Sequence, residues 1–298
     1  MVYHYTTIET FYNMLATYKG SEDKNHLEFW ASSIFDQNDK EELSLTAKDI
    51  MPVIKEIEKS IKKKSFTDLY KLSTVDEQWW IPTLTGQKVK ENVNDFFKNE
   101  YNIPYTVSFS QNEDKLLMWT MYANNGNGIC LAFDESKLVN RNAYRFAVPD
   151  IVVYKKEPQN HKKIVKMYYD MYLKELAKMN IINGIYNLKR KYWECILIGI
   201  SPYIKNHAFE DEAEYRIAYY VAGKNNPPVY TRLTNRLHII NFIKVKIPLE
   251  ALQYIIIGPC ADYQKTKDLL IDNIMSCKIL RDYNDDFIRE SQIPFRLY

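Results

Sequence analysis

Four acidic side chains are crowded into five residues late in the chain, and an arginine follows them. They belong to the stretch Glu210–Tyr220, which continues into an apolar and aromatic run. If this stretch is a strand, its period of two places Glu212, Glu214 and Arg216 on one face. Tyr215, Ile217 and Tyr219 fall on the other face, which suits packing against the core.

Two interpretations of this stretch are open. In the structural one, Arg216 neutralises a neighbouring acid at the end of a strand. In the functional one, the arginine holds a catalytic carboxylate in place. Structural ion-pair networks are common in proteins, so the stretch taken alone favours the structural interpretation.

Residues 2–6 are predicted to form a short strand that leads directly into a helix ending near Gly20. Thr6 and Glu9 have the spacing of a capping box, with Thr6 as the N-cap. His4 would then lie at a strand end beside a helix N-terminus, where backbone amides favour anionic groups. The alternative is a core histidine that is hydrogen-bonded to the backbone.

A second group of polar side chains lies in the middle of the chain. Residues 105–110 alternate like a strand, with Ser108 and Ser110 on one face. A short helix follows at residues 115–122 and carries Trp119 and Tyr122. These hydroxyls and rings could line a ligand cleft, or the serines could simply bond to nearby backbone.

The composition narrows the class of protein. The chain has 298 residues, 46% of them hydrophobic, which allows a sizeable core. Only 8 residues are glycine, and neither a P-loop nor a dinucleotide fingerprint is present. The net charge of +2 does not indicate a dedicated nucleic-acid binder, although short basic runs could form local patches.

Cysteine and histidine positions argue against a metal site. The four cysteines are far apart and the five histidines lack ligand spacing, so no disulfide framework or metal is expected. No apolar signal segment opens the sequence, and the longest apolar run is too short to span a bilayer. These features predict a cytoplasmic protein with no role at a membrane.

The pattern of elements predicts one α+β domain over residues 1–298, with a mixed or antiparallel sheet. Two helical excursions interrupt it, at about 40–101 and 160–205, and Trp79-Trp80 are expected to anchor the first to the core. Buried strands are expected at 129–133 and 254–257. A helix is expected at 261–276, and a last strand at 279–283.

Several segments, taken in order, resemble the bacterial domain-of-unknown-function family numbered 2971. They are Asn38-Asp39 with Glu42, Ser108-Phe109-Ser110, Asp114 with Met118-Trp119 and Tyr122, Gly128 through Phe133, Glu212 through Arg216, and Ile257-Gly258-Pro259. The resemblance covers most of the chain, and its most specific part is the block from Ser108 to Tyr122. The family usually has proline after Asn-Asp, where this chain has Lys40. The family name implies no activity.

The order of three motifs also resembles the signature of ADP-ribosyltransferases, whose sheet forms a cleft for NAD. The motifs are Tyr3-His4-Tyr5-Thr6 before a helix, a Ser-x-Ser strand, and a late Glu-x-Glu strand. The resemblance implies that Glu214 supports glycosidic cleavage and that Glu212 helps to deprotonate an acceptor. The residues expected to contact NAD are His4, Thr6, Ser108, Ser110, Trp119, Tyr122 and Arg216.

The chemistry implied by this resemblance is coherent. Breaking the bond to nicotinamide builds positive charge on the ribose, as in glycoside hydrolysis. A fixed carboxylate stabilises that charge, and a second acid on the same strand face, about 6.5–7 Å away, could act as a base. Arg216 could keep a carboxylate ionised or bind a phosphate. The expected acceptor is a protein or a nucleic acid.

The leading hypothesis is therefore an NAD-consuming, ADP-ribosyltransferase-like enzyme, acting as a toxin or phage-defence effector with an antitoxin partner or self-association. The alternative is a non-catalytic sensor that binds a nucleotide or partner, with Glu212, Glu214 and Arg216 as a structural ion-pair set. An activity directed at RNA or DNA is a third hypothesis. A metal-dependent nuclease is disfavoured, because no compact acid and histidine cluster exists beyond residues 210–214.

Overall fold

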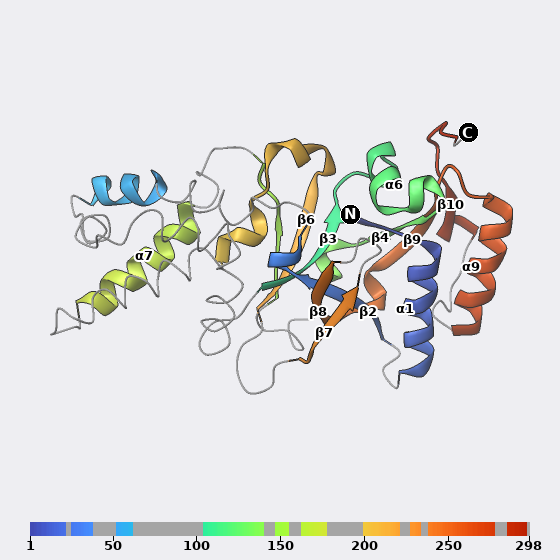
Figure 1. Cartoon of the computed structure of the whole chain (residues 1–298), viewed down its shortest axis with the longest axis horizontal. Helices are drawn as coiled ribbons and strands as arrows, with labels where there is room; N and C mark the ends of the chain where they lie inside the picture. Colours follow the sequence, from blue (N-terminus) through green and yellow to red (C-terminus); the bar gives the residue numbers. More distant parts are fainter. Residues whose placement is uncertain are drawn as a thin grey trace. The chain divides into compact units, whose positions relative to one another are not determined.

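A ten-stranded mixed sheet organises the described part of the chain (Figure 1). In this computed structural model, the described residues are 1–21, 25–37, 52–61, 104–139, 147–154, 162–177, 199–220, 227–233, 238–277 and 285–296. Several sequence predictions fall outside them, including those on Asn38-Asp39, Trp79-Trp80 and the strand at 279–283.

Residue contacts divide the chain into two compact units. The first unit contains Met1–Ser33, Tyr105–Ile151 and Glu210–Tyr298, and the second contains Ile34–Pro104 and Val152–Phe209. The two segments of the second unit enclose the ranges 40–101 and 160–205, in which helical excursions were predicted. Within those ranges, residues 52–60 and the helix α7 (Lys162–Leu176) are helical.

The strands of the sheet are β1 (Val2–Thr6), β2 (His26–Ser33), β3 (Pro104–Ser110), β4 (Ile129–Phe133), β5 (Ala147–Ile151), β6 (Glu214–Tyr220), β7 (Val229–Leu233), β8 (Ile239–Pro248), β9 (Leu252–Ile257) and β10 (Ile288–Glu290). Their order is β10-β9-β4-β1-β3-β2-β8-β7, and β6 pairs with both β3 and β5. β10 pairs with β9 in parallel, whereas the other pairs with a described register are antiparallel. The prediction of an α+β protein with a mixed sheet is therefore confirmed.

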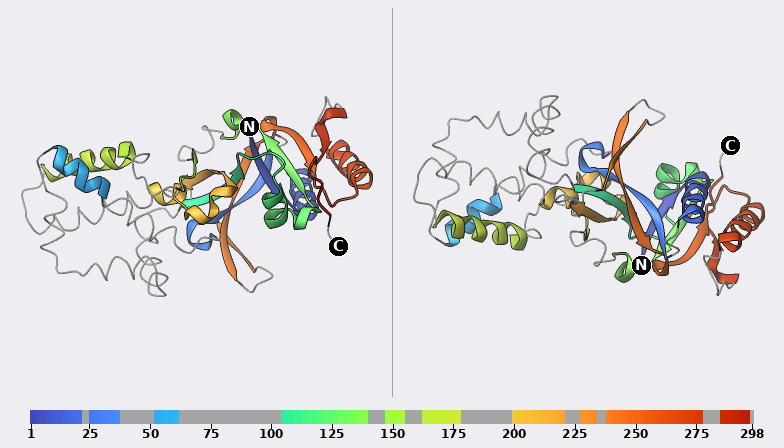
Figure 2. Two further views of the ribbon diagram at one scale, coloured as in Figure 1. Left: turned by 90° about the horizontal axis from the view of Figure 1, so that it is seen from above. Right: turned by 90° about the horizontal axis from the view of Figure 1, so that it is seen from below.

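Three helices of the first unit pack on this sheet or on each other: α1 (Ile8–Gly20), α6 (Leu116–Tyr122) and α9 (Tyr263–Cys277). α1 and α9 lie side by side in Figures 1 and 2 and contact each other. α6 contacts β1, and its Met118 and Trp119 are buried.

The N-terminal cap of α1 differs from the prediction by one residue. Thr7, not Thr6, caps the helix, because the Thr7 side chain accepts a hydrogen bond from the Thr10 backbone N–H at 3.0 Å. Thr6 is instead the last residue of β1, where it pairs with Ile129 of β4. The strand pairing therefore takes Thr6 out of the capping position.

The second unit has a small interior of its own. Tyr169 and Tyr172 of α7 are fully buried, and the Tyr169 hydroxyl donates to Glu58 Oε1 at 2.8 Å. At the surface, Lys162 of α7 forms an ion pair with Glu56. These contacts join residues 52–60 to α7.

Candidate functional site

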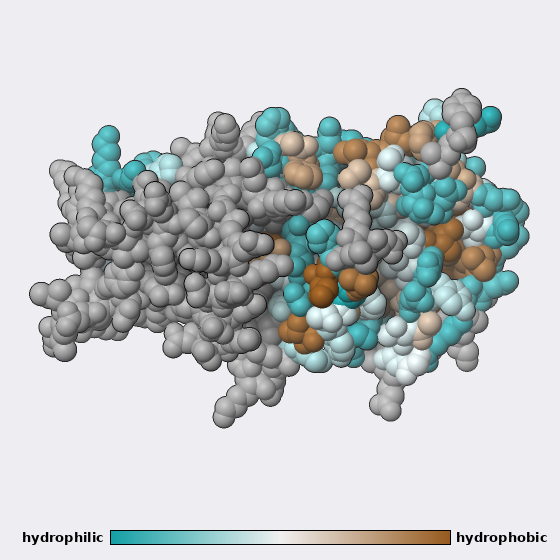
Figure 3. All heavy atoms as spheres, in the orientation of Figure 1, coloured by the Kyte–Doolittle hydropathy of each residue, from teal (hydrophilic) through white to brown (hydrophobic). Residues whose placement is uncertain are grey.

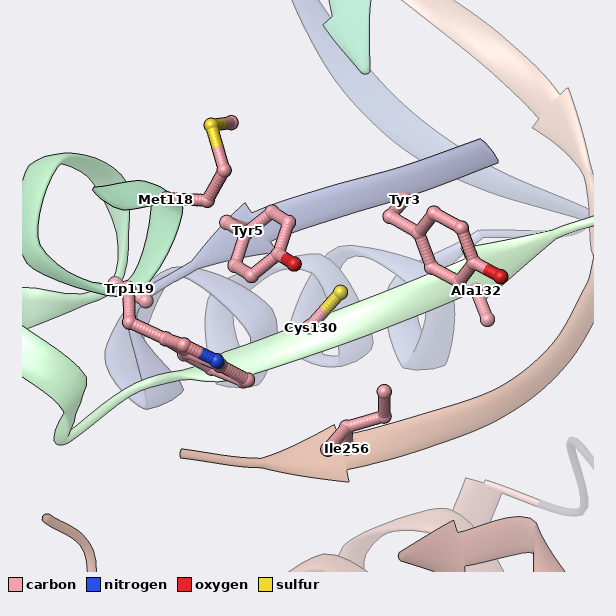
Figure 4. Packing of buried hydrophobic residues seen from close by; sticks show 8 residues of the cluster. Tyr3, Tyr5, Met118, Trp119, Cys130, Ala132 and Ile256 are labelled. Atoms are coloured by element: carbon pink, nitrogen blue, oxygen red, sulfur yellow. The ribbon is translucent and has the colours of Figure 1, made fainter. Parts of the chain in front are cut away.

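The register between β1 and β3 determines which predicted residues share a face of the sheet. Tyr3 pairs with Ser110, so their side chains point to the same side, and alternation adds Tyr5 and Ser108 to it. We call this side the tyrosine face. Figure 4 shows the rings of Tyr3 and Tyr5 projecting from one side of β1.

The opposite side of the same strands is lined by aromatic rings. The His4 ring contacts Phe109 at 5.7 Å and Phe29 at 5.1 Å between centroids, both edge to face. Phe133 packs against Phe109 at 5.7 Å. We call this side the phenylalanine face.

β6 pairs with β3, so its side chains extend both the tyrosine face and the phenylalanine face. The Tyr215 ring contacts Phe109 at 6.5 Å, which places Tyr215 on the phenylalanine face. Glu214 and Arg216 are its neighbours along the strand and therefore point to the tyrosine face. Both faces of β6 are buried here, since Glu214 is 5% exposed and Tyr215 is 9% exposed.

Glu214 and Arg216 form a buried bidentate ion pair. Arg216 Nε donates to Glu214 Oε1 at 2.7 Å, and Arg216 Nη2 donates to Glu214 Oε2 at 3.0 Å. The Arg216 side chain is 0% exposed. This planar, two-bond geometry is the strongest form of carboxylate recognition in proteins. The predicted pairing of the arginine with a neighbouring acid is present at Glu214.

Glu212 is not on the strand, so its predicted position is wrong. It ends the 3-10 segment η7 (His207–Glu212), and β6 begins only at Glu214. Ala213 between them has a φ of +43°, a left-handed conformation that costs about 1–2 kcal/mol outside glycine. This turn breaks the period of two on which the prediction depended.

Contacts from β3 and α6 nevertheless hold Glu212 in place just before β6. The Tyr122 hydroxyl donates to Glu212 Oε1 at 2.6 Å. Ser110 is fully buried, and its hydroxyl donates to the Glu212 carbonyl oxygen at 2.6 Å. We call Ser110, Tyr122, Glu212, Glu214 and Arg216 the acid–arginine cluster. For Ser110, the structure contains the alternative in which the hydroxyl bonds to nearby backbone.

The turn after β3 fixes the approach to this cluster. The Gln111 backbone N–H donates to the Ala213 carbonyl at 2.8 Å. Lys115 Nζ donates to Asp211 Oδ1 at 2.9 Å and to its carbonyl at 2.7 Å. The segment 111–115 after β3 and the segment 210–213, which contains Glu212, are thereby held together.

His4 and Thr6 lie on the other side of the sheet from the cluster. His4 is half-buried between rings, and its Nδ1 lies 3.0 Å from the Ser108 carbonyl oxygen. A carbonyl can only accept, so Nδ1 carries the proton. Thr6 is buried and follows His4 by two residues, so it points to the same phenylalanine face. The backbone-bonded core histidine, the alternative left open by the sequence, is the arrangement found.

The environment of His4 has a consequence for pH dependence. Burial lowers the pKa of His4 below its ordinary value of 6.5, and the bond to Ser108 only partly offsets this. Below pH 6.5 the His4 imidazole of the unfolded chain binds a proton more readily than that of the folded chain. The contribution of neutral His4 to the free energy of unfolding is therefore complete above that pH, and it is lost as the pH falls toward the folded-state pKa. We expect the free energy of unfolding to decrease between pH 7 and pH 5, roughly across that unfolded value, and to decrease less in His4→Asn.

Urea unfolding at a series of pH values measures this difference, since asparagine keeps an N–H near the Nδ1 position but does not titrate. His207→Asn is the matched control because His207 is exposed. Parallel pH curves for the wild type and His4→Asn would contradict the prediction.

Trp119 is a core residue and not part of an open wall. It is 0% exposed and packs edge to face on Tyr5 at 4.9 Å between centroids. Its indole Nε1 donates to Asp114 Oδ1 at 2.7 Å. Figure 4 shows Trp119 and Cys130 converging on Tyr5. These contacts give Trp119 a packing role, on the same side of the sheet as the acid–arginine cluster.

A further polar cluster on the tyrosine face had no clear sequence signal. Glu113 accepts from the Tyr254 hydroxyl at 2.8 Å and from the Tyr3 hydroxyl at 3.3 Å. The guanidinium of Arg289 lies 3.6 Å from the centre of the Tyr254 ring. Burial, first of all, raises the pKa of both Tyr3 and Tyr254. The four residues come from distant segments, so no local pattern could have connected them.

Among the described residues, no group of three or more histidine, cysteine, aspartate or glutamate side chains is arranged to hold a metal ion. In the same ranges, none of the helices is long and apolar enough to cross a membrane.

Chemically, the acid–arginine cluster offers two buried carboxylates, those of Glu212 and Glu214. The Glu214 carboxylate accepts two charge-assisted bonds from Arg216, and the Glu212 carboxylate accepts a hydrogen bond from the Tyr122 hydroxyl. A fixed anion is suited to stabilising a developing cation, and a second acid is suited to accepting a proton.

A family model matches a segment of the chain that contains part of this site. Residues 118–217 match the model of a family described as Protein of unknown function (DUF2971). The matched segment contains Tyr122, Glu212, Glu214 and Arg216, whereas Ser110 precedes it. No curated protein and no solved structure matches the chain. The match covers residues 118–217, and so it shows that this segment of the chain is similar to the DUF2971 family.

Proposed function

We propose that the chain is an NAD-consuming enzyme similar to ADP-ribosyltransferases, with its chemistry at the acid–arginine cluster. The observation that carries the proposal is the buried bidentate pair of Glu214 and Arg216, which fixes one carboxylate two residues along the chain from a second acid, Glu212. A toxin or phage-defence role, which the resemblance implies, is part of the same proposal.

In the proposed reaction, the bond between ribose C1′ and the nicotinamide nitrogen breaks, and its electron pair leaves with neutral nicotinamide. The positive charge that develops on the ribose is stabilised by the Glu214 carboxylate, which Arg216 holds in place. An acceptor nucleophile then bonds to C1′ and loses its proton to Glu212. Tyr122 orients Glu212 through its hydroxyl.

Nicotinamide release from NAD, with and without cell lysate, is the experiment that tests this proposal. We expect release by the wild type and at least a hundredfold loss in Glu214→Gln, a scale typical for removal of one charge-stabilising group. Glu9→Gln is the matched control, because Glu9 is exposed in the first turn of α1.

Glu214→Gln also leaves the buried Arg216 without its carboxylate, so loss of activity could come from loss of the fold. The double variant Glu214→Gln/Arg216→Met removes both charges and avoids that problem. A folded double variant that lacks activity supports catalysis by the carboxylate. A wild type that releases no nicotinamide in either condition excludes the enzyme.

A second candidate is a non-catalytic protein that binds a nucleotide or a partner through the same region. The specific observation in its favour is that both Glu214 oxygens are bonded to Arg216 and the residue is only 5% exposed. This candidate is supported if calorimetry detects NAD binding while no nicotinamide is released. This candidate also predicts that Glu214→Gln lowers the melting temperature of the protein without affecting any enzymatic activity.

A further inference from the structure

Three aromatic rings form a stack across β2, β8 and β7. Phe242 lies between Trp30, at 4.5 Å and 21° between ring planes, and Tyr230, at 5.5 Å and 25°. Tyr230 pairs directly with Phe242, and Trp30 is its diagonal neighbour because it pairs with Lys244. Trp30 is 47% exposed and Tyr230 is 38% exposed, whereas Phe242 is buried between them.

Positive charges surround these rings. The Arg232 guanidinium lies 5.8 Å from the centre of the Trp30 ring, and Lys244 Nζ lies 5.2 Å from that of Tyr230. Lys244 also pairs with Glu28 Oε1 at 3.0 Å, and the exposed Lys246 lies opposite Glu28 in the register. Among the described residues named here, there are three cations and one acid, a net charge of +2 (3 − 1).

We call this surface the aromatic platform, and it consists of Glu28, Trp30, Tyr230, Arg232, Phe242, Lys244 and Lys246. All of them lie on one side of the sheet. Within each strand they are two residues apart, and the register pairs Tyr230 with Phe242 and Trp30 with Lys244. Figure 2 shows β7 and β8 as a long hairpin. The space-filling view shows brown, strongly apolar side chains at the surface near β7 and β8 (Figure 3), and on this colour scale they are not the tryptophan and tyrosine of the platform.

The aromatic platform continues the tyrosine face of the sheet. Ser32 of β2 pairs with Thr106 of β3, so these two side chains share a side. Thr106 is in phase with Ser108 and Ser110, and Ser32 is in phase with Trp30. The platform and the acid–arginine cluster therefore lie on the same side of one continuous sheet.

We propose that the aromatic platform binds single-stranded nucleic acid. Trp30 and Tyr230 each turn one ring face toward Phe242, so an unpaired base would stack on their outer faces, beside Arg232 and Lys244. Arg232, Lys244 and Lys246 lie within the same surface, where they meet the phosphates of a strand that crosses it. A duplex keeps its bases stacked inside, so the platform discriminates in favour of single strands.

Charge favours nucleic acid over a protein partner for this surface. Tryptophan, tyrosine and arginine also occur at protein interfaces. Among the described residues, however, the rings have three cations and one acid near them, and the larger exposed aliphatic side chains of the β7–β8 hairpin are on the other side of the sheet. These are Val229, Leu233 and Ile239, which are 53%, 63% and 62% exposed. The inference does not depend on the proposed NAD chemistry.

Fluorescence anisotropy with labelled single-stranded oligonucleotides of about a dozen nucleotides tests the proposal, a length within the usual range of single-strand sites. The arms are RNA, DNA of the same sequence, and the corresponding DNA duplex, each over a series of salt concentrations without NAD. We expect both single strands to bind more tightly than the duplex, with affinity that falls as salt rises.

The variants separate stacking from charge. Tyr230→Ala and Trp30→Ala should each weaken binding by about 5- to 150-fold, the range measured for base-stacking rings, and Trp30→Phe should restore part of it. Arg232→Gln and Lys246→Gln should lower the slope of affinity against salt. Leu233→Ala, on the other side of the hairpin, and Lys265→Gln, exposed on α9, are controls that should leave binding unchanged.

Lack of binding at low salt would overturn the proposal, as would equal losses in the control variants or a preference for duplex. Glu214→Gln/Arg216→Met should bind single strands as the wild type does. This variant therefore distinguishes failure of the platform from failure of the NAD chemistry.

Discussion

Arg216→Met should lower the free energy of unfolding by about 3–5 kcal/mol, the usual cost of removing one partner from a buried ion pair. The Glu214 carboxylate would keep its buried position but lose two charge-assisted bonds, at 2.7 and 3.0 Å. The free-energy cost of burying the Glu214 carboxylate would then no longer be offset by the Arg216 guanidinium. Urea denaturation at neutral pH measures the change.

A double variant tests whether the pair itself is the cause. Glu214→Met/Arg216→Met replaces both charges with apolar side chains, and we expect it to recover most of the stability that Arg216→Met loses. Lys166→Met is the matched control, because its ion pair with Asp170 is about half exposed on each side. Such pairs contribute about 0.3–0.5 kcal/mol. A loss of less than about 1 kcal/mol in Arg216→Met, comparable with an exposed pair, would contradict a structural role for the ion pair.

Trp119→Ala should also destabilise the protein by about 3–5 kcal/mol, through the cavity that it leaves in the core. The indole is fully buried against Tyr5, and its N–H bonds to Asp114. Asp114 also accepts from the Ser291 hydroxyl and from the Gln292 backbone N–H at 2.7 Å. Loss of the indole therefore removes one of the groups that hold the start of α6 against the C-terminal segment.

Thermal and urea unfolding of Trp119→Ala and Trp119→Phe measure this effect, with a smaller loss expected for phenylalanine. Tyr12→Ala is the control, because Tyr12 is 51% exposed on α1 and surface changes usually stay within about 0.5 kcal/mol. If Trp119→Ala kept full stability, the indole would not be the packing element that its burial indicates. Such a result would instead favour the sequence prediction, in which the Trp119 ring lines a ligand cleft.

Local patterns predicted most strands well, because alternation and β-branched or aromatic content report directly on a pleated, buried surface. β1 and β4 have the predicted bounds, and β3 and α6 begin within one residue of them. The strand was predicted to include Glu212, but it begins at Glu214, because Ala213 adopts a turn conformation. A left-handed turn at Ala213 has no sequence signal when the residue is alanine and not glycine.

The candidate site was harder to predict, because its geometry depends on pairing between distant segments. The sequence shows that Glu214 and Arg216 are two apart, which is sufficient for them to meet on one strand face. It does not show that β6 pairs with β3, which brings Ser110 to Glu212 across 102 positions of sequence. It also does not show that Tyr122 reaches Glu212 from α6.

The sequence by itself determined the α+β class, the acid and arginine run, and the order of the principal strands of the first unit, since these follow from local composition and period. Tertiary structure decided which side of the sheet each polar residue occupies. One pairing, Tyr3 with Ser110, separates His4 from the serines expected to share its site. Another, Ser32 with Thr106, puts the aromatic platform on the side of the acid–arginine cluster. Register is a long-range property, and a shift of one residue would reverse both assignments.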